Sequence, residues 1–86
     1  MLTLSDGVRS SQTPDGAIVL DIRGGRMFTF NATGSRILEL LKSGTGEKEI
    51  ALMLVSEFSV EPETAKTDAD EFLTLLRQHA LIESRS

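Results

Sequence analysis

The sequence predicts an α+β domain in which a three-stranded antiparallel N-terminal sheet is followed by three helices. Three observations support this fold class. Apolar residues alternate with polar ones in the first third of the chain, they recur at helical spacing afterwards, and no linker rich in Gly, Ser or Pro separates the two regions. With 86 residues, the chain has the length of one small domain, so we expect a single domain over residues 1–86 without a separate cofactor-binding fold.

Two turn signals divide the first third into strands. Pro14 and Gly16 suit a tight turn, because Pro fixes φ at about −65° and Gly tolerates positive φ. The Gly24-Gly25 pair lies between two β-rich runs and predicts a hairpin, since both of its positions tolerate positive φ. The predicted strands are therefore Val8–Gln12, Ala17–Arg23 and Arg26–Phe30.

The length of the hairpin loop decides which residues of the two strands are paired. If Gly24-Gly25 alone forms the loop, Ile22 lies opposite Met27. One face then carries Ile18, Leu20, Ile22, Met27 and Thr29, and the other carries Val19, Asp21, Phe28 and Phe30. The third strand has large apolar side chains on both faces, although it lies at the edge of the predicted sheet. Such an edge is either covered, by helices on one face and the N-terminal segment on the other, or open to an incoming strand.

Capping residues and apolar spacing predict the first two helices. Asn31 is suited to cap a helix over Ala32–Lys42, whose last residue complements the helix dipole. Thr45 is suited to cap a second helix that runs to Glu57.

A third helix is predicted from Pro62 to His79, because Pro is favoured at the first helical position. Its apolar stripe consists of Ala65, Ala69, Phe72, Leu73 and Leu76. The segment that follows, Ala80–Glu83, is short and apolar, and we expect it to pack back on the core.

The sequence contains no constellation of residues for catalysis or metal binding. It has no cysteine and a single histidine, His79, which excludes thiolate chemistry and two-histidine metal sites. The Gly44–Lys48 segment lacks the spacing of a phosphate-binding loop, and Ser35 lacks a nucleophile elbow. We therefore expect no catalytic residue, no metal and no cofactor, and we interpret the carboxylates of the third helix as a solvated face.

Net charge and hydropathy argue against nucleic-acid-binding, membrane and secreted proteins. The 9 basic and 13 acidic side chains give a net charge of −4, which disfavours nucleic acid and anionic membranes as partners. No apolar run reaches the roughly 18 residues of a transmembrane helix, and the start of the chain lacks the features of a signal peptide. We therefore expect a cytoplasmic protein, in agreement with the absence of cysteine.

Two binding functions suit a hairpin combined with three helices. A winged helix usually reads DNA through a basic helix, but the third helix here carries four acids against two bases, and phosphates would repel it. Peptide capture fits better, because an open apolar edge beside a helix can bind an extended peptide through main-chain hydrogen bonds. A DNA-binding regulator is the alternative.

Several runs of the sequence, in this order and spacing, resemble a known family. They are IVLDIRGGRMFTFN at residues 18–31, GSRILELL at 34–41, Glu49–Ala51, Val60–Ala65, Phe72–Leu76 and Leu81–Glu83. Together they resemble the PqqD-like family, whose members are also called RiPP recognition elements, after ribosomally synthesised and post-translationally modified peptides. The resemblance covers about residues 8–83, and the chain departs from the family pattern at Met27, where Tyr is common, and at Phe30, where Leu is common.

The resemblance implies a winged-helix-like module that is not an enzyme. Such a module binds the leader segment of a precursor peptide by strand addition and presents it to a modifying enzyme, often of the radical-SAM type, as in pyrroloquinoline quinone biosynthesis. Carried over to this chain, the peptide-binding residues are Arg26, Met27, Phe28, Thr29 and Phe30 from the third strand, and Lys66, Asp70, Leu73 and Arg77 from the third helix. Met27 and Thr29 are favoured for direct contact, because Phe28, Phe30 and Leu73 also suit the core. We expect a monomer or a weak homodimer, since an open edge can pair with a second copy.

Overall fold

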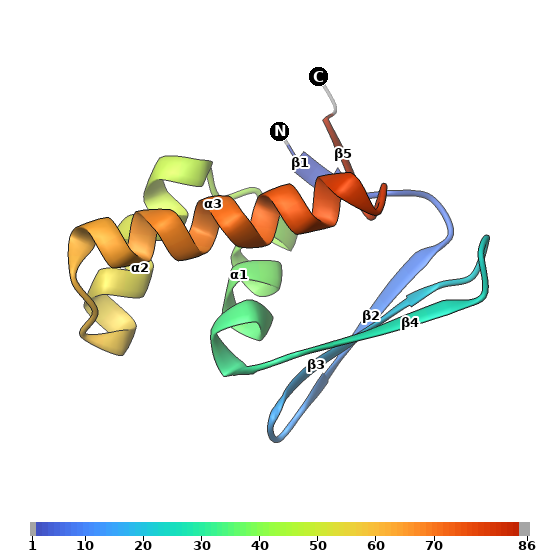
Figure 1. The fold of residues 1–86 in the computed structure, drawn as a ribbon, viewed down its shortest axis with the longest axis horizontal. Helices are drawn as coiled ribbons and strands as arrows, with labels where there is room; N and C mark the ends of the chain where they lie inside the picture. Colours follow the sequence, from blue (N-terminus) through green and yellow to red (C-terminus); the bar gives the residue numbers. More distant parts are fainter. Residues whose placement is uncertain (1, 85–86) are drawn as a thin grey trace.

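The computed structural model describes residues 2–84, so that Met1, Arg85 and Ser86 lie outside the described residues. The described elements are β1 (Leu2–Leu4), β2 (Val8–Thr13), β3 (Gly16–Asp21), β4 (Arg26–Phe30), α1 (Ala32–Lys42), α2 (Glu47–Phe58), α3 (Pro62–Gln78) and β5 (Ile82–Ser84). The α+β class is as predicted. Figure 1 shows the long helix α3 lying across the molecule, while the sheet of β2, β3 and β4 extends away from the helices. Within residues 2–84, no helix combines the length and the apolar character needed to cross a membrane.

The main sheet has the order β2-β3-β4, so that β4 lies at an edge, as predicted. The predicted hairpin register is wrong by two positions, because Met27 pairs with Leu20 rather than with Ile22. The loop comprises Ile22–Gly25, because the last pair of the hairpin is Asp21 with Arg26. The N–H of Ile22 donates to the carbonyl of Gly7 at 2.9 Å, on the β2 side of the sheet. A shift of two positions keeps every paired side chain on its predicted face.

A second sheet, which the sequence did not predict, joins the two ends of the described chain. Its strands β1 and β5 are antiparallel, and Thr3 faces Glu83. Strands of three residues are too short to show an alternating pattern. The segment expected to pack back on the core does so, since Leu81 and Ile82 are buried. The N-terminal segment is thus held by β5, and the outer face of the main sheet keeps Met27 64 % exposed.

A side-chain cap marks the start of α1 but not the start of α2. Asn31 caps α1 as predicted, because the N–H of Gly34 donates to Asn31 Oδ1 at 3.0 Å. The predicted cap of the second helix is wrong, since α2 is preceded by Gly46 and not by Thr45. The N–H of Thr45 donates instead to the carbonyl of Leu40 at 2.9 Å, so that Thr45 belongs to the turn that ends α1.

The core lies between the three helices and the inner face of the main sheet. Its most deeply buried large side chains are Val19, Ile37, Leu41, Ile50, Leu54, Leu73, Leu76 and Leu81. The predicted stripe of α3 is buried except at Phe72, which is partly exposed beside β4. α3 ends at Gln78, one residue earlier than predicted, and His79 is its C-cap.

Candidate functional site

The inner face of β4 packs on one side of α3 through two aromatic contacts. The ring centroids of Phe28 and His79 are 4.9 Å apart, and those of Phe30 and Phe72 are also 4.9 Å apart in an edge-to-face arrangement. Because the start of β4 meets the end of α3, the strand and the helix run in opposite directions. The edge of β4 and the side of α3 that carries Phe72 and His79 therefore border one surface with aromatic side chains at its floor, and we call this surface the groove.

Glycine at position 34 allows α1 to approach this floor closely. A Cβ atom there would lie 2.9 Å from Phe72 Cε1 and 3.0 Å from Phe30 Cβ. A side chain at position 34 would therefore displace Phe72 or Phe30, the two residues whose rings join β4 to α3.

Among residues 2–84, no strand pairs with the outer edge of β4, and this edge presents the main-chain groups of two residues. Thr13 and Gly16 close the two-residue turn between β2 and β3, so alternate residues of β3, starting at Gly16, bond to β2. The remaining residues of β3 bond to Arg26, Phe28 and Phe30 of β4. The N–H and C=O groups of Met27 and Thr29 consequently point away from the sheet, toward the open edge.

At the far end of the groove, beyond Phe30, the surface is hollowed. The hollow has a volume of about 320 Å³ and is lined by Asn31, Thr33, Gly34, Ile37, Asp68, Glu71, Phe72 and Leu75. Phe72 and Leu75 supply apolar surface, whereas Asp68 and Glu71 are exposed carboxylates at its rim. This end of the groove has room for a side chain of an extended ligand.

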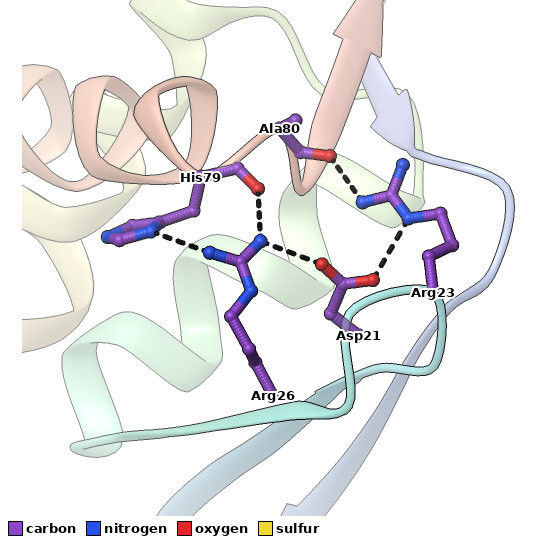
Figure 2. Close-up of polar contacts among 5 residues, drawn as sticks. All are labelled: Asp21, Arg23, Arg26, His79 and Ala80. Carbon is purple, nitrogen blue, oxygen red and sulfur yellow. Dashed lines mark hydrogen bonds and ion pairs between the residues drawn. The ribbon is translucent and has the colours of Figure 1, made fainter.

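At the other end, a buried carboxylate ties the sheet to α3 (Figure 2). Asp21 is 3 % exposed, and its carboxylate oxygens accept hydrogen bonds from Arg23 Nε at 2.9 Å and Arg26 Nη2 at 2.8 Å. Each guanidinium group also binds a carbonyl after α3, since Arg23 donates to Ala80 at 2.9 Å and Arg26 to His79 at 3.1 Å. The hydrogen bonds from Arg23 and Arg26 hold the pKa of the Asp21 carboxyl well below its usual range. These five residues form the hairpin latch, which links the hairpin of β3 and β4 to the end of α3.

The comparison with protein families identifies the kind of chain that carries this groove. Residues 16–82 match the family model described as coenzyme PQQ synthesis protein D (PqqD). The chain belongs to the PqqD family. This confirms the resemblance seen in the sequence, although no curated protein matches the chain.

Two solved structures resemble this PqqD-family chain over nearly their whole length. TbiB1 in complex with the TbiA(beta) leader peptide is 33% identical, with a TM-score of 0.88, and the match covers 98% of each chain. Lasso peptide synthetase B1 complexed with the leader peptide is 28% identical, also with a TM-score of 0.88, over 96% of this chain and 98% of that chain. Both similar proteins were therefore solved with a leader peptide bound.

In this PqqD-family chain, the strand half of the expected site lies together along β4. Met27 is 64 % exposed on the outer face, where Thr29 is also exposed. Phe28 and Phe30 are partly buried at the floor of the groove. Arg26 is bound in the hairpin latch, and its guanidinium carbon lies 5.5 Å from the centroid of the Phe28 ring.

The helix half of the expected site does not join β4. Leu73 is only 1 % exposed and belongs to the core, and Arg77 is paired with Glu47 at the start of α2. Lys66 and Asp70 line a different hollow, of about 550 Å³, between α2 and α3. The structure thus separates these four residues from the groove beside β4.

The α3 residues that do face the groove form another row, namely Asp68, Phe72, Leu75 and His79. At about 100° per residue, this row lies on roughly the opposite side of α3 from Lys66, Asp70 and Arg77. The aromatic side chain of Phe72, placed in the predicted stripe, was the only sequence signal for it. The other members of the row, Asp68, Leu75 and His79, follow from Phe72 by steps of three or four residues along the helix.

Proposed function

We propose that this protein binds the leader segment of a ribosomally synthesised precursor peptide and presents the precursor to a modifying enzyme. The observation that carries the proposal is the unpaired edge of β4 beside the aromatic floor of the groove. An edge of this kind binds an extended peptide through main-chain hydrogen bonds, while pockets for alternate side chains supply specificity. The leader complexes of the two similar proteins support the same role here.

In the proposed complex, the leader adds to β4 as an antiparallel strand. Met27 and Thr29 exchange main-chain hydrogen bonds with the peptide, each worth about 1 kcal/mol net. Peptide residues opposite Phe28 and Phe30 point their side chains toward α3, where Phe72 and Leu75 offer apolar contact. In this arrangement the peptide makes no direct contact with the four other residues of the expected site. Lys66 and Asp70 line the hollow on the α2 side, Leu73 belongs to the core, and Arg77 pairs with Glu47.

We propose further that the protein acts by binding alone, with the chemistry supplied by a partner enzyme of the radical-SAM type or another modifying enzyme. It works as a monomer or a weak homodimer. The alternative function, DNA reading, finds no support in α3, where Asp68, Asp70 and Glu71 are exposed and would repel phosphates.

An NMR titration tests the binding proposal. The ligand is a synthetic leader peptide from the precursor reading frame that neighbours the gene for this chain, and a scrambled peptide of the same composition is the control. We expect amide signals of residues 26–30 and 72–79 to shift with the leader and to stay in place with the scrambled peptide. Unmoved amides in both segments at saturating leader would contradict the proposal.

A further inference from the structure

Large apolar side chains gather on the outer face of the main sheet, on the side away from the groove. Leu20 is 44 % exposed and Met27 is 64 % exposed, and the two residues are directly paired across β3 and β4. Ile22, in the adjoining loop, is 63 % exposed. Single exposed apolar residues are ordinary on a protein surface, but a contiguous group indicates a surface that is covered in use.

The register arranges this outer face in two rows that run across the strands toward the edge of β4. One row consists of Arg9, Leu20 and Met27, and the other of Ser11, Ile18 and Thr29. The first row is apolar where it reaches the edge, at Met27, and the second ends in the hydroxyl-bearing Thr29. A strand added at β4 lengthens each row by one side chain, since directly opposed residues share a face.

We propose that the bound peptide is read on both faces of the extended sheet, and that the outer apolar row selects an apolar side chain opposite Met27. This inference rests on the proposed function and assigns a specificity to it. The occupant of the outer patch is the peptide itself, because the peptide residue opposite Met27 is necessarily the next member of the row. The N-terminal segment does not compete for this place, since β1 is paired with β5.

The two faces together define the class of peptide that the site accepts. In an antiparallel complex, four successive peptide residues lie opposite Phe30, Thr29, Phe28 and Met27. The first and third residues face the apolar floor of the groove, the second lies beside the hydroxyl of Thr29, and the fourth extends the outer apolar row. The favoured pattern from N to C is therefore apolar, polar or β-branched, apolar, apolar, which differs from the simple alternation expected if only the groove were read.

Synthetic leader peptides that differ only at the residue opposite Met27 test this inference by their dissociation constants. The residue is Leu, Lys or Glu, and the proteins are the wild type, Met27→Lys and Leu52→Lys. Leu52 is the matched control, because it is 66 % exposed on α2 and therefore as accessible as Met27. The wild type should bind the Leu peptide about fivefold more tightly than either charged peptide. Met27→Lys should bind the Glu peptide most tightly and the Lys peptide least, whereas Leu52→Lys should keep the wild-type order.

Three results would overturn the inference. In the first, the dissociation constants of the wild type for the three peptides agree within twofold, which is compatible with strand addition but excludes selection by the outer face. In the second, Met27→Lys keeps the wild-type order of the peptides. In the third, sedimentation shows a wild-type dimer that Met27→Lys dissociates with no change in peptide affinity, so that a second copy covers the patch. A wild type that binds no leader peptide would instead contradict the proposed function itself.

Discussion

Asp21 contributes to the spacing between β4 and α3 through the two arginines that it binds. It is buried at the end of β3, and its carboxylate holds two arginines, each of which also binds a carbonyl after α3. Without this carboxylate, Arg23 and Arg26 would lose their shared acceptor and repel each other, which should weaken the link from Arg26 to the end of α3. Asp21, which lies on the strand next to β4, thereby helps to position the open edge of β4.

The low pKa of Asp21 predicts a particular loss of stability in acid. Because the folded-state pKa lies below the unfolded value, the unfolded chain binds more protons as the pH falls below about 5. The contribution of Asp21 is therefore complete at neutral pH and is lost as the pH falls toward the folded-state pKa. In thermal melts from pH 7 down to pH 2, the wild type should lose more stability than Asp21→Asn, which is already destabilised at pH 7.

Glu57→Gln is the control for this prediction. Glu57 binds Arg36 at 2.7 Å in an ion pair outside the hairpin latch, and its pKa is also lowered by that hydrogen bond. Both variants should lose less stability than the wild type between pH 7 and pH 2. Only Asp21→Asn should also speed amide hydrogen exchange in residues 26–30. Equal exchange of these residues in the two variants would show that Asp21 does not position β4.

At the scale of an element, the edge of β4 acts through its main chain. Thr29→Pro removes an N–H that points to the open edge, so leader binding should weaken by about fivefold to tenfold. Ser10→Pro is the matched control, because the alternation of hydrogen bonds also points Ser10 outward, on the opposite edge of the sheet, β2. It should leave the leader affinity unchanged. Equal losses in the two variants would indicate a general effect of proline on the sheet.

The orientation of α3 decides which of its residues would meet the peptide in the proposed complex. Leu75 is 37 % exposed and lines the groove, whereas Lys66 lines the hollow on the α2 side. Leu75→Asp should weaken leader binding by about tenfold or more, since it places a charge against apolar peptide side chains. Lys66→Asp should change the affinity by less than twofold. The reverse order, measured by isothermal titration calorimetry, would assign the peptide to the α2 side of α3.

The elements also show how far the sequence could be interpreted. The bounds of α1 and β4 were predictable because capping by Asn31 and the glycine turn are local signals. The hairpin register was not, since residues of the loop and its ends are held by contacts that no turn motif records, from Ile22 to Gly7 and from Asp21 to Arg23 and Arg26. The strand half of the proposed site was suggested by apolar residues on both faces of β4. The row of α3 depends instead on how α2 and β4 pack around the helix, which no local pattern records.

For the whole molecule, the distribution of charge separates peptide binding from DNA binding. The chain carries a net charge of −4, and residues 44–86 hold nine acids against four bases. Several of these acids are exposed on α3, the helix that a winged-helix protein would place in the major groove. The groove beside β4 instead offers main-chain groups and apolar side chains, whose interactions depend weakly on ionic strength.

Salt dependence should therefore distinguish the two functions. Leader affinity should change by less than about threefold between 50 mM and 200 mM salt, because few ion pairs form with the peptide. Duplex DNA should produce no mobility shift at 50 mM salt, where phosphate contacts are strongest. A DNA complex whose affinity fell by about a thousandfold between 50 mM and 200 mM salt would contradict the conclusion that α3 does not bind DNA. A salt dependence this steep requires the release of counterions from several phosphates. A variant with Asp68→Lys and Glu71→Lys is the positive control, since it reverses the charge of the exposed face of α3 and should gain salt-sensitive DNA binding.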